Sequence, residues 1–258
     1  MQGGNSRVMF SEEVAWVTGS STGIGRASAV ALAEQGCRVA VHFNRSEDEA
    51  REVIEQIKAS GGEAMLVGGD VSEAGEVERM TREIEDRYGR LDVLVNNAGS
   101  LIERRNFSEM TEDLWDRVMS VNLKSVFLCS KAILPIMKRQ GSGRIINMTS
   151  VAARNGGGPG SAAYASAKGG VSTLTRAMAK ELVSENILVN GVAPGIITTP
   201  FHDRFTPPDV RENMSAAIPI GREGTPEEVA GAVLFLASPW ANYLVGEIIE
   251  VNGGQLMS

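Results

Sequence analysis

The stretch Val14-Ala-Trp-Val-Thr-Gly-Ser-Ser-Thr-Gly-Ile-Gly25 decides the fold. Its first four residues predict a short buried strand, the glycines predict a turn, and residues 26–35 carry helix-forming side chains before Gly36. This order brings backbone N–H groups and the positive end of a helix dipole to one point. The stretch therefore predicts an anion site, most simply for a pyrophosphate. The alternative is that the glycines only permit a tight turn.

Strand and helix patterns alternate along the rest of the chain. Strands are predicted over residues 38–43, 64–67, 91–95, 144–148, 188–192 and 248–251. Helices are predicted over 46–60, where Ser46-Glu-Asp-Glu49 is typical of a capping box, over 73–88, from the Thr111 region to Arg139, and from Thr225. Because no linker or repeat interrupts this order, residues 1–258 are expected to form one α/β domain. Its core is a doubly wound, parallel, seven-stranded sheet with helices on both faces, and residues 1–12 are a disordered or tag-like extension.

Composition and charge narrow the classes of function. The 258 residues include 25 basic and 32 acidic side chains, a formal charge of −7, and no basic cluster is long enough to follow a phosphate backbone. No apolar run approaches the roughly 18 residues that cross a bilayer, and the first residues lack the apolar core of a signal peptide. We therefore expect no nucleic-acid partner, no membrane span and a cytoplasmic location. Cys37 and Cys129, and His42 and His202, are not placed like a disulfide or a metal site, so no metal is predicted.

Polar and glycine-rich segments follow the predicted strands, and in a doubly wound sheet ligands bind at these carboxyl ends. At the end of the second strand an acidic side chain would bind the ribose 2′-hydroxyl of a dinucleotide. Here Asn44, Arg45 and Ser46 come first, and no carboxylate precedes Glu47. A 2′-phosphate is better tolerated beside a guanidinium, which favours NADP(H), with NAD(H) possible. The alternative is that Arg45 is only a solvated loop residue.

Ser161-Ala-Ala-Tyr-Ala-Ser-Ala-Lys168 places a phenol and an ammonium on one face of a predicted helix, roughly 40° apart around the axis and about 6 Å along it. The positive neighbour is expected to lower the pKa of Tyr164 and make it a proton donor and acceptor near neutral pH. The same spacing also arises by chance in exposed helices. Asn122 lies in an apolar helical stretch, so its amide must find hydrogen-bond partners and is structural, catalytic or both.

Five motifs together resemble the short-chain dehydrogenase/reductase superfamily, from about Glu13 to Gly254. They are Thr18-Gly19-x-x-x-Gly23-Ile24-Gly25, Asn96-Asn97-Ala98-Gly99, Ser150, Tyr164-x-x-x-Lys168 and Pro194-Gly195. The resemblance implies a Rossmann-type fold, a nicotinamide cofactor and a homotetramer. It also implies a catalytic tetrad of Asn122, Ser150, Tyr164 and Lys168.

The resemblance implies a role for each tetrad residue. Tyr164 exchanges the proton and Ser150 orients the substrate oxygen, while Lys168 lowers the phenol pKa and holds the nicotinamide ribose. Asn122 is expected to fix a water that links Lys168 to solvent. The expected cofactor-binding residues are Gly19, Ser21, Thr22, Gly23, Ile24, Gly25, Asn44, Arg45, Ser46, Asp70, Val71, Asn97, Ala98, Gly99, Tyr164, Lys168, Pro194, Gly195, Ile197 and Thr199.

The chain departs from the family pattern at two places. Thirteen residues separate Ser150 from Tyr164 where the family commonly has twelve, and the extra residue is expected in Asn155-Gly-Gly-Gly158. The loop beside the substrate is therefore expected to be reshaped, with Ser150 still catalytic. The family often has a basic residue in the first glycine motif when it uses NADP(H), and this chain has Thr22 there.

The overall pattern is most similar to 3-oxoacyl-(acyl-carrier-protein) reductases and to sugar, polyol and gluconate dehydrogenases. An acyl or small-molecule carbonyl or alcohol is thus the expected substrate. Reductases that accept the acidic carrier protein present arginines near the site; Arg139 suits this role, but Glu185 stands where a second would be and would repel the carrier. The other class of function is a catalytically silent dinucleotide sensor, although such proteins typically lose the tyrosine or the lysine.

Residues 201–218 are expected to be an irregular lid that covers the substrate and carries specificity. They contain Pro207-Pro208 and mixed charges, and lack a firm helical pattern before about Asp209. The alternative is an ordinary surface loop.

Overall fold

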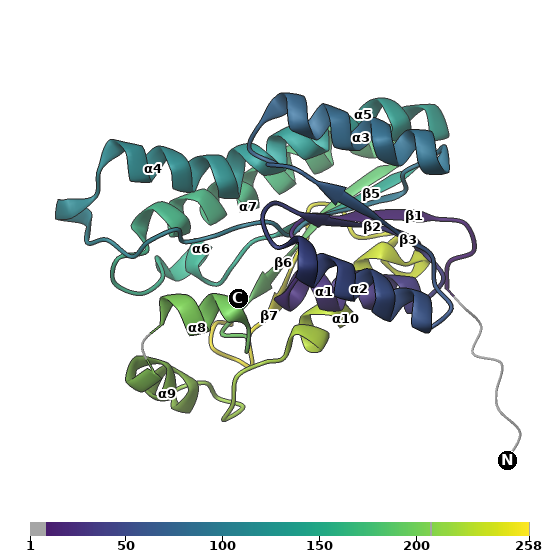
Figure 1. Cartoon of the computed structure of the whole chain (residues 1–258). Helices are drawn as coiled ribbons and strands as arrows, with labels where there is room; N and C mark the ends of the chain where they lie inside the picture. The colour runs from purple at the N-terminus through teal and green to yellow at the C-terminus, as the bar shows by residue number, and fades with distance from the viewer. Residues whose placement is uncertain (1–8, 207, 258) are drawn as a thin grey trace, which may run out of the picture.

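A parallel seven-stranded sheet in the order β3-β2-β1-β4-β5-β6-β7 forms the centre of the protein (Figure 1). The computed structural model describes residues 9–206 and 208–257. The strands are β1 (Val14–Val17), β2 (Arg38–Phe43), β3 (Ala64–Gly68), β4 (Val93–Asn96), β5 (Gly143–Met148), β6 (Ile187–Pro194) and β7 (Ile248–Val251). Strand order reverses between β1 and β4, which pair in parallel, so the expected doubly wound sheet is confirmed.

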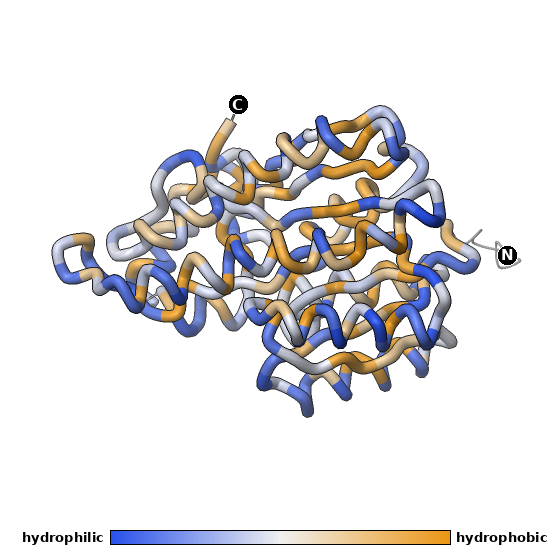
Figure 2. Tube along the Cα trace, turned by 90° about the horizontal axis from the view of Figure 1, so that it is seen from above, coloured by the Kyte–Doolittle hydropathy of each residue, from blue (hydrophilic) through white to orange (hydrophobic). Residues whose placement is uncertain are grey.

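Helices cover both faces of the sheet. Val17 and Ala15 point toward α1 (Gly23–Glu34), α2 (Glu47–Ala59) and α10 (Pro226–Ala237), whereas Val14 and Trp16 pack on the other side. That side is covered by α3 (Ala74–Tyr88), α5 (Ser125–Gln140) and α7 (Ala162–Leu182). Because both faces are buried, the strands are apolar without alternation, and Figure 2 shows hydrophobic residues concentrated along the central segments.

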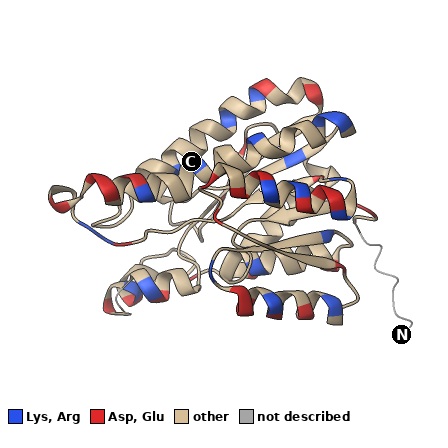
Figure 3. Ribbon diagram, turned by 45° about the horizontal axis from the view of Figure 1, so that its top comes forward, with Lys and Arg blue, Asp and Glu red and all other residues tan. Residues whose placement is uncertain are grey.

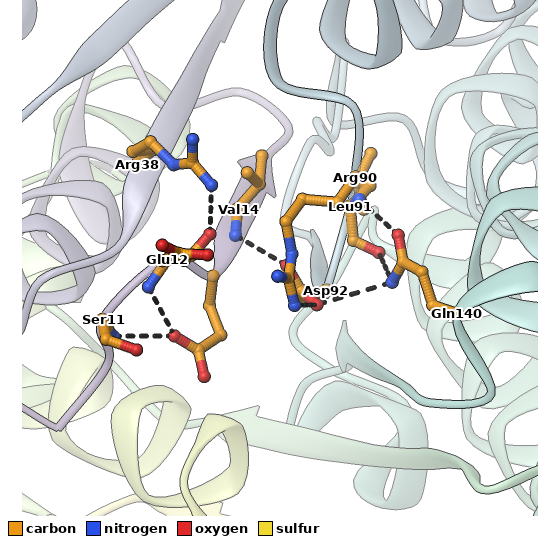
Figure 4. Close-up of polar contacts among 9 residues, drawn as sticks. Ser11, Glu12, Val14, Arg38, Arg90, Leu91, Asp92 and Gln140 are labelled. Carbon is orange, nitrogen blue, oxygen red and sulfur yellow. Dashed lines mark hydrogen bonds and ion pairs between the residues drawn. The ribbon is translucent and has the colours of Figure 1, made fainter.

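The amino-terminal edge of the sheet is closed by a polar network (Figure 4). The Asp92 carboxylate accepts hydrogen bonds from the Val14 amide at 2.8 Å and from Arg90 Nε and Nη2, each at 2.8 Å. The Gln140 side chain exchanges hydrogen bonds with the Leu91 backbone at 2.9 and 3.1 Å. These bonds connect the start of β1, the start of β4 and the end of α5.

The predicted helix from Thr111 to Arg139 is not one regular helix. It divides into α4 (Glu112–Met119), a π-helical turn η2 (Ser120–Lys124) and α5. Together residues 112–140 are the one helical stretch in the described part of the chain with the length and apolar composition of a membrane span. Cys129, Ile133 and Met137 of this stretch pack in the core against the sheet, as a core helix of a folded domain does.

Two local predictions are corrected. Phe10, placed in the expected extension 1–12, is buried in the core, and its amide donates to the Gln35 carbonyl at 2.9 Å; residues 1–8 lie outside the described part. Ser46 makes no side-chain cap, because its ψ of 65° departs from the extended conformation that aims a capping hydroxyl. The capping box at Thr225 and Glu228 is confirmed.

The expected irregular lid is instead largely helical. It forms α8 (Pro200–Phe205) and α9 (Pro208–Ala216), with Pro207 outside the described residues. Proline favoured a loop in the sequence, but Pro200 occupies the first turn of its helix, where its missing N–H costs nothing. Arg211 of α9 donates to Glu223 at 2.7 Å through both Nε and Nη2 and also pairs with Asp203, so the two helices are tied to the segment before α10.

Candidate active site

One cleft of about 1280 Å³ runs along the carboxyl ends of the strands. It lies over the point where strand order reverses between β1 and β4, where doubly wound folds bind dinucleotides. Its volume exceeds the usual range of a drug-sized pocket, so it can hold an extended ligand. Every predicted cofactor-binding residue lines it, as do Ser150, Tyr164 and Lys168.

The glycine turn after β1 leaves no space for side chains. Gly19 and Gly23 have φ values of 63° and 55°, the left-handed region that glycine tolerates best. A Cβ added at Gly25 would lie 2.2 Å from the Gly19 carbonyl oxygen and 2.5 Å from Asn97 Nδ2. Helix α1 begins at Gly23, earlier than predicted, so its first free N–H groups lie within the turn. This cradle fits a pyrophosphate.

The end of β4 is joined to the glycine turn. Asn97 Nδ2 donates to the carbonyls of Thr18 and Gly19, both at 2.9 Å, and the Thr18 hydroxyl accepts from the amides of Asn97 and Ala98. The two carboxyl ends at the switch point therefore hold each other in position.

The His42 side chain holds the glycine turn in place, a role that no sequence motif indicated. Its Nδ1 accepts from the Gly19 amide at 2.8 Å, and its Nε2 lies 3.0 Å from the Gly69 carbonyl, which it reaches as the N–H donor. Burial lowers the pKa of His42 to about 4, so the ring stays neutral and keeps Nδ1 as an acceptor. The described residues contain no group of three side chains suited to a metal.

Residues that follow β2 and β3 line the end of the cleft that lies away from Ser150, Tyr164 and Lys168. Burial raises the pKa of Asp70, but hydrogen bonds from the Ser72 amide and hydroxyl and from Asn44 outweigh it and hold that pKa below its usual value. Arg45 and Ser46 line the same end. The segment after β2 thus presents a guanidinium and no carboxylate before Glu47, and the Asp70 carboxylate after β3 is engaged by Ser72 and Asn44.

Ser150, Tyr164 and Lys168 meet at the other end. Burial raises the pKa of Tyr164 to about 12, opposed by a hydrogen bond with Ser150, so the two hydroxyls are neighbours. The Lys168 ammonium lies 5.7 Å from the centre of the Tyr164 ring and donates to the Met148 carbonyl at 2.7 Å. Burial lowers the pKa of Lys168 to about 8. The expectation of a lowered phenol pKa is therefore wrong, because burial raises it.

Asn122 lies behind the cleft rather than in it. The π turn shifts the backbone pairing, and the fully buried Asn122 amide donates to the carbonyls of Val118 at 2.8 Å and Ser100 at 2.7 Å. Its oxygen accepts from the Ser100 amide at 3.1 Å. A Cβ added at Gly99 would meet both this oxygen at 2.7 Å and the Lys168 nitrogen at 3.3 Å. Asn122 therefore fixes the loop that passes beside Lys168.

The wall beside Tyr164 comes from α8, in the predicted lid segment, and from loops, of which no sequence motif singled out residues 100–104. Phe201 packs against the Tyr164 ring with centroids 5.7 Å apart, and Phe205 packs on Phe201 at 5.1 Å. Further residues on this side are Ser100, Leu101, Ile102, Arg104, Asn155, Ser161, His202, Arg204, Met214 and Gln255.

Arg139 and Glu185, expected near the site, lie at the opposite edge of the sheet. Arg139 is in the last turn of α5, which leads into the start of β5, and it pairs with Glu85. Glu185 precedes β6 and pairs with Lys138 at 2.8 Å. Within one chain, neither residue lines the cleft.

Comparison with known proteins defines the class. A family model described as enoyl-(acyl-carrier-protein) reductase matches residues 19–255. The chain belongs to the short-chain dehydrogenase/reductase family and is an oxidoreductase. The resemblance found in the sequence is thereby confirmed.

Individual relatives indicate which members of this family the chain resembles. A 3-oxoacyl-(acyl-carrier-protein) reductase from Synechocystis sp. is 45% identical over 251 residues, 95% of this chain and 97% of the relative. The reductase of that name from Staphylococcus aureus is 45% identical over 244 residues, 94% of this chain and 98% of the relative. A crystal structure described as a candidate NAD(P)-dependent gluconate 5-dehydrogenase from Beutenbergia cavernae, with NADP at low occupancy, has a TM-score of 0.91 at 35% identity. The match covers 98% of this chain and 100% of that one.

Proposed function

We propose that the protein is an NADP(H)-dependent reductase of 3-oxoacyl thioesters. The observation that carries this proposal is the convergence of Ser150, Tyr164 and Lys168 at one end of a cleft whose other end has a glycine cradle and Arg45. The relatives named as 3-oxoacyl-(acyl-carrier-protein) reductases and the NADP bound to the Beutenbergia protein support the substrate and the cofactor.

The chain's own side chains divide the work as follows. When bound, a nicotinamide dinucleotide supplies the hydride. Tyr164 donates the proton to the carbonyl oxygen, and its raised pKa keeps the phenol protonated at neutral pH, which suits reduction. Ser150 donates a hydrogen bond to the same oxygen, and Lys168 holds the ribose and returns a proton to Tyr164. Asn122 acts through the loop that it fixes, and in our proposal also orders a water beside Lys168.

A sugar, polyol or gluconate dehydrogenase is the second candidate. It is supported by the Beutenbergia structure. It is also supported by the position of Arg139 and Glu185, because neither lines the cleft within one chain and they therefore form no carrier-binding pair at the mouth of the cleft. Assays of acetoacetyl-CoA, acetoacetyl carrier protein and 5-ketogluconate with NADPH and NADH in parallel decide between the candidates. Binding of NADPH without turnover of any substrate would instead support a silent sensor.

Replacing Tyr164 with Phe tests the catalytic assignment. The variant keeps the ring contact with Phe201 but cannot donate a proton, so kcat is expected to fall by about 10²–10⁴-fold. NADPH binding, measured by fluorescence titration, should persist. Turnover within a few-fold of wild type would remove Tyr164 from the mechanism.

We further propose one catalytic domain over residues 1–258, with residues 201–218 as the lid, in a cytoplasmic homotetramer with no nucleic-acid or membrane partner. Trp240, Tyr243 and Val245 support assembly, because these large apolar side chains are exposed on one chain. Light scattering coupled to gel filtration tests the tetramer.

A further inference from the structure

Arg104 connects two walls of the cleft. It follows β4 in the chain, and its Nε donates to the Phe205 carbonyl of α8 at 2.5 Å. Its Nη1 donates to the Pro159 carbonyl at 3.0 Å, on the loop that precedes α7. A guanidinium has five N–H donors. Two of these five donors make the bonds to Phe205 and Pro159, and the two bonds hold the guanidinium in place at the cleft.

The glycine loop that lengthens the spacing between Ser150 and Tyr164 makes room for this side chain. A Cβ added at Gly160 would lie 3.2 Å from Arg104 Cβ and 3.0 Å from the Arg105 amide nitrogen. A Cβ added at Gly158 would lie 3.8 Å from Arg104 Nη1. The departure from the family spacing thus coincides with the position of Arg104.

Arg104 has no acidic partner within residues 9–206 and 208–257. No ion pair in the described residues includes it or Arg204, which also lines the cleft. The nearest acids in sequence are already paired, Glu103 with Arg105 and Asp203 with Arg211. Burial lowers the pKa of Arg104, and its charge contributes to a lowered pKa of His202 in the same wall, after burial and Arg211.

Arg104, which takes part in no ion pair of the described residues, contrasts with the charged residues over the rest of the molecule. The chain has a formal charge of −7, and Figure 3 shows acidic and basic residues interspersed along the outer helices. A partly buried cation without a counter-ion costs free energy unless a ligand supplies the charge. Such a group at a substrate cleft favours an anionic ligand.

We propose that Arg104 binds an anionic group of the substrate, a carboxylate or a phosphate, while Tyr164 and Ser150 hold the carbonyl. Phe201 packs on the Tyr164 ring, Phe205 packs on Phe201, and the Phe205 carbonyl accepts from Arg104 Nε, so the two phenylalanines connect Tyr164 with Arg104. In this proposal the part of the substrate between the anion and the carbonyl runs beside these rings and is less polar. The inference rests on the proposed function and deepens it. A sugar acid would supply the carboxylate, and a coenzyme A or carrier-protein thioester would supply the phosphate.

Paired substrates that differ in charge test the proposal. One pair is acetoacetyl-CoA and neutral acetoacetyl-N-acetylcysteamine, and the other is 5-ketogluconate and neutral fructose. Whichever anionic substrate the wild-type enzyme reduces, its KM should rise at least about tenfold in Arg104→Gln, because the variant loses a charge-assisted hydrogen bond to the anion. KM for its neutral partner and the Kd for NADPH should stay within about twofold. The pair that responds identifies phosphate or carboxylate as the anion.

Two further variants separate recognition from structure. Arg105→Gln is the matched control, because Arg105 is adjacent, exposed and paired with Glu103, and it should leave every KM unchanged. Arg104→Lys keeps the charge but loses the planar fork, so its KM for the anionic member should be intermediate. It also serves if Arg104→Gln fails to fold.

An equal rise of KM for anionic and neutral members would show that Arg104 only ties the walls together, and unchanged KM values would equally overturn the proposal. If wild type reduces no member, the proposed function fails by itself. Calorimetric titration of the NADPH complex with coenzyme A and with gluconate then tests Arg104 separately. Binding lost in Arg104→Gln supports the inference, and equal or absent binding in both proteins refutes it.

Discussion

The two edges of the sheet satisfy their polar groups in opposite ways. At the amino-terminal edge, Asp92 is 8% exposed and receives hydrogen bonds from Val14, Arg90 and Gln140, all within the chain. At the carboxyl edge, the first N–H groups of α1 and the Arg104 guanidinium face the cleft. Among the described residues, no comparable network of side chains satisfies all of their donors. One edge contributes to folding, and the other retains binding capacity at a cost in stability.

The comparison also separates rigid from adaptable parts of the carboxyl edge. Backbone hydrogen bonds and the side chains of Asn97 and His42 hold the dinucleotide end in one conformation. The substrate end is formed by two short helices held by Arg211 and Glu223 and by side chains of Phe201 and Phe205. Changes at the first end should affect cofactor binding sharply, whereas changes at the second should alter substrate preference.

The largest expected effect is at Gly25. In Gly25→Ala, the new Cβ would meet the Gly19 carbonyl oxygen at 2.2 Å, so the cradle must distort. The Kd for NADPH should rise at least about 100-fold, equivalent to roughly 2.7 kcal/mol. Fluorescence titration of NADPH measures this change.

Gly75→Ala is the matched control, because a Cβ added there meets nothing within 4 Å in α3. It should leave cofactor binding unchanged and raise stability slightly, since alanine favours helix. Equal NADPH affinity in both variants would contradict the assignment of the cradle.

A smaller effect, on stability alone, is expected at Asp92. Asp92→Asn removes the charge that Arg90 contacts, and the free energy of unfolding should fall by about 2 kcal/mol. Urea unfolding measures the loss, while kcat and KM should remain within twofold. The exposed pair of Glu47 and Arg51 is the control, and Glu47→Gln should change little. Lost catalysis in folded Asp92→Asn would mean that the two edges are not independent.

The strands, their order and the lining of the cleft were predictable because they depend on local patterns. Val14–Val17 is apolar throughout, and each strand is followed by polar or glycine residues that parallel pairing brings to one edge. The roles of His42 and Arg104 depend instead on partners that are distant in sequence, Gly19 and Phe205. No local pattern indicates such contacts.

The wrong predictions have similar causes. The π turn at 120–124 carries the same apolar spacing as an α-helix, so only the backbone pairing reveals it. Helix α8 was missed because prolines indicate a loop or a helix start equally well. The pKa of Tyr164 was predicted from its charged neighbour alone, whereas burial, which a local sequence pattern does not reveal, raises that pKa.

The smallest expected effect tests whether the carboxyl edge is kept at a cost in stability. Burial lowers the pKa of Lys168 to about 8, against about 10.5 in the unfolded chain, so the folded state disfavours the charged amine. Lys168→Met should therefore unfold at higher urea at pH 7, by about 1 kcal/mol, while losing turnover. Between pH 8 and 10.5 the native wild type releases a proton that the unfolded chain retains, so its stability rises with pH and the advantage of the variant disappears. Urea titrations of both proteins at pH 7 and pH 9.5 measure this, and a constant difference between them would mean that the Lys168 amine is not destabilised by burial.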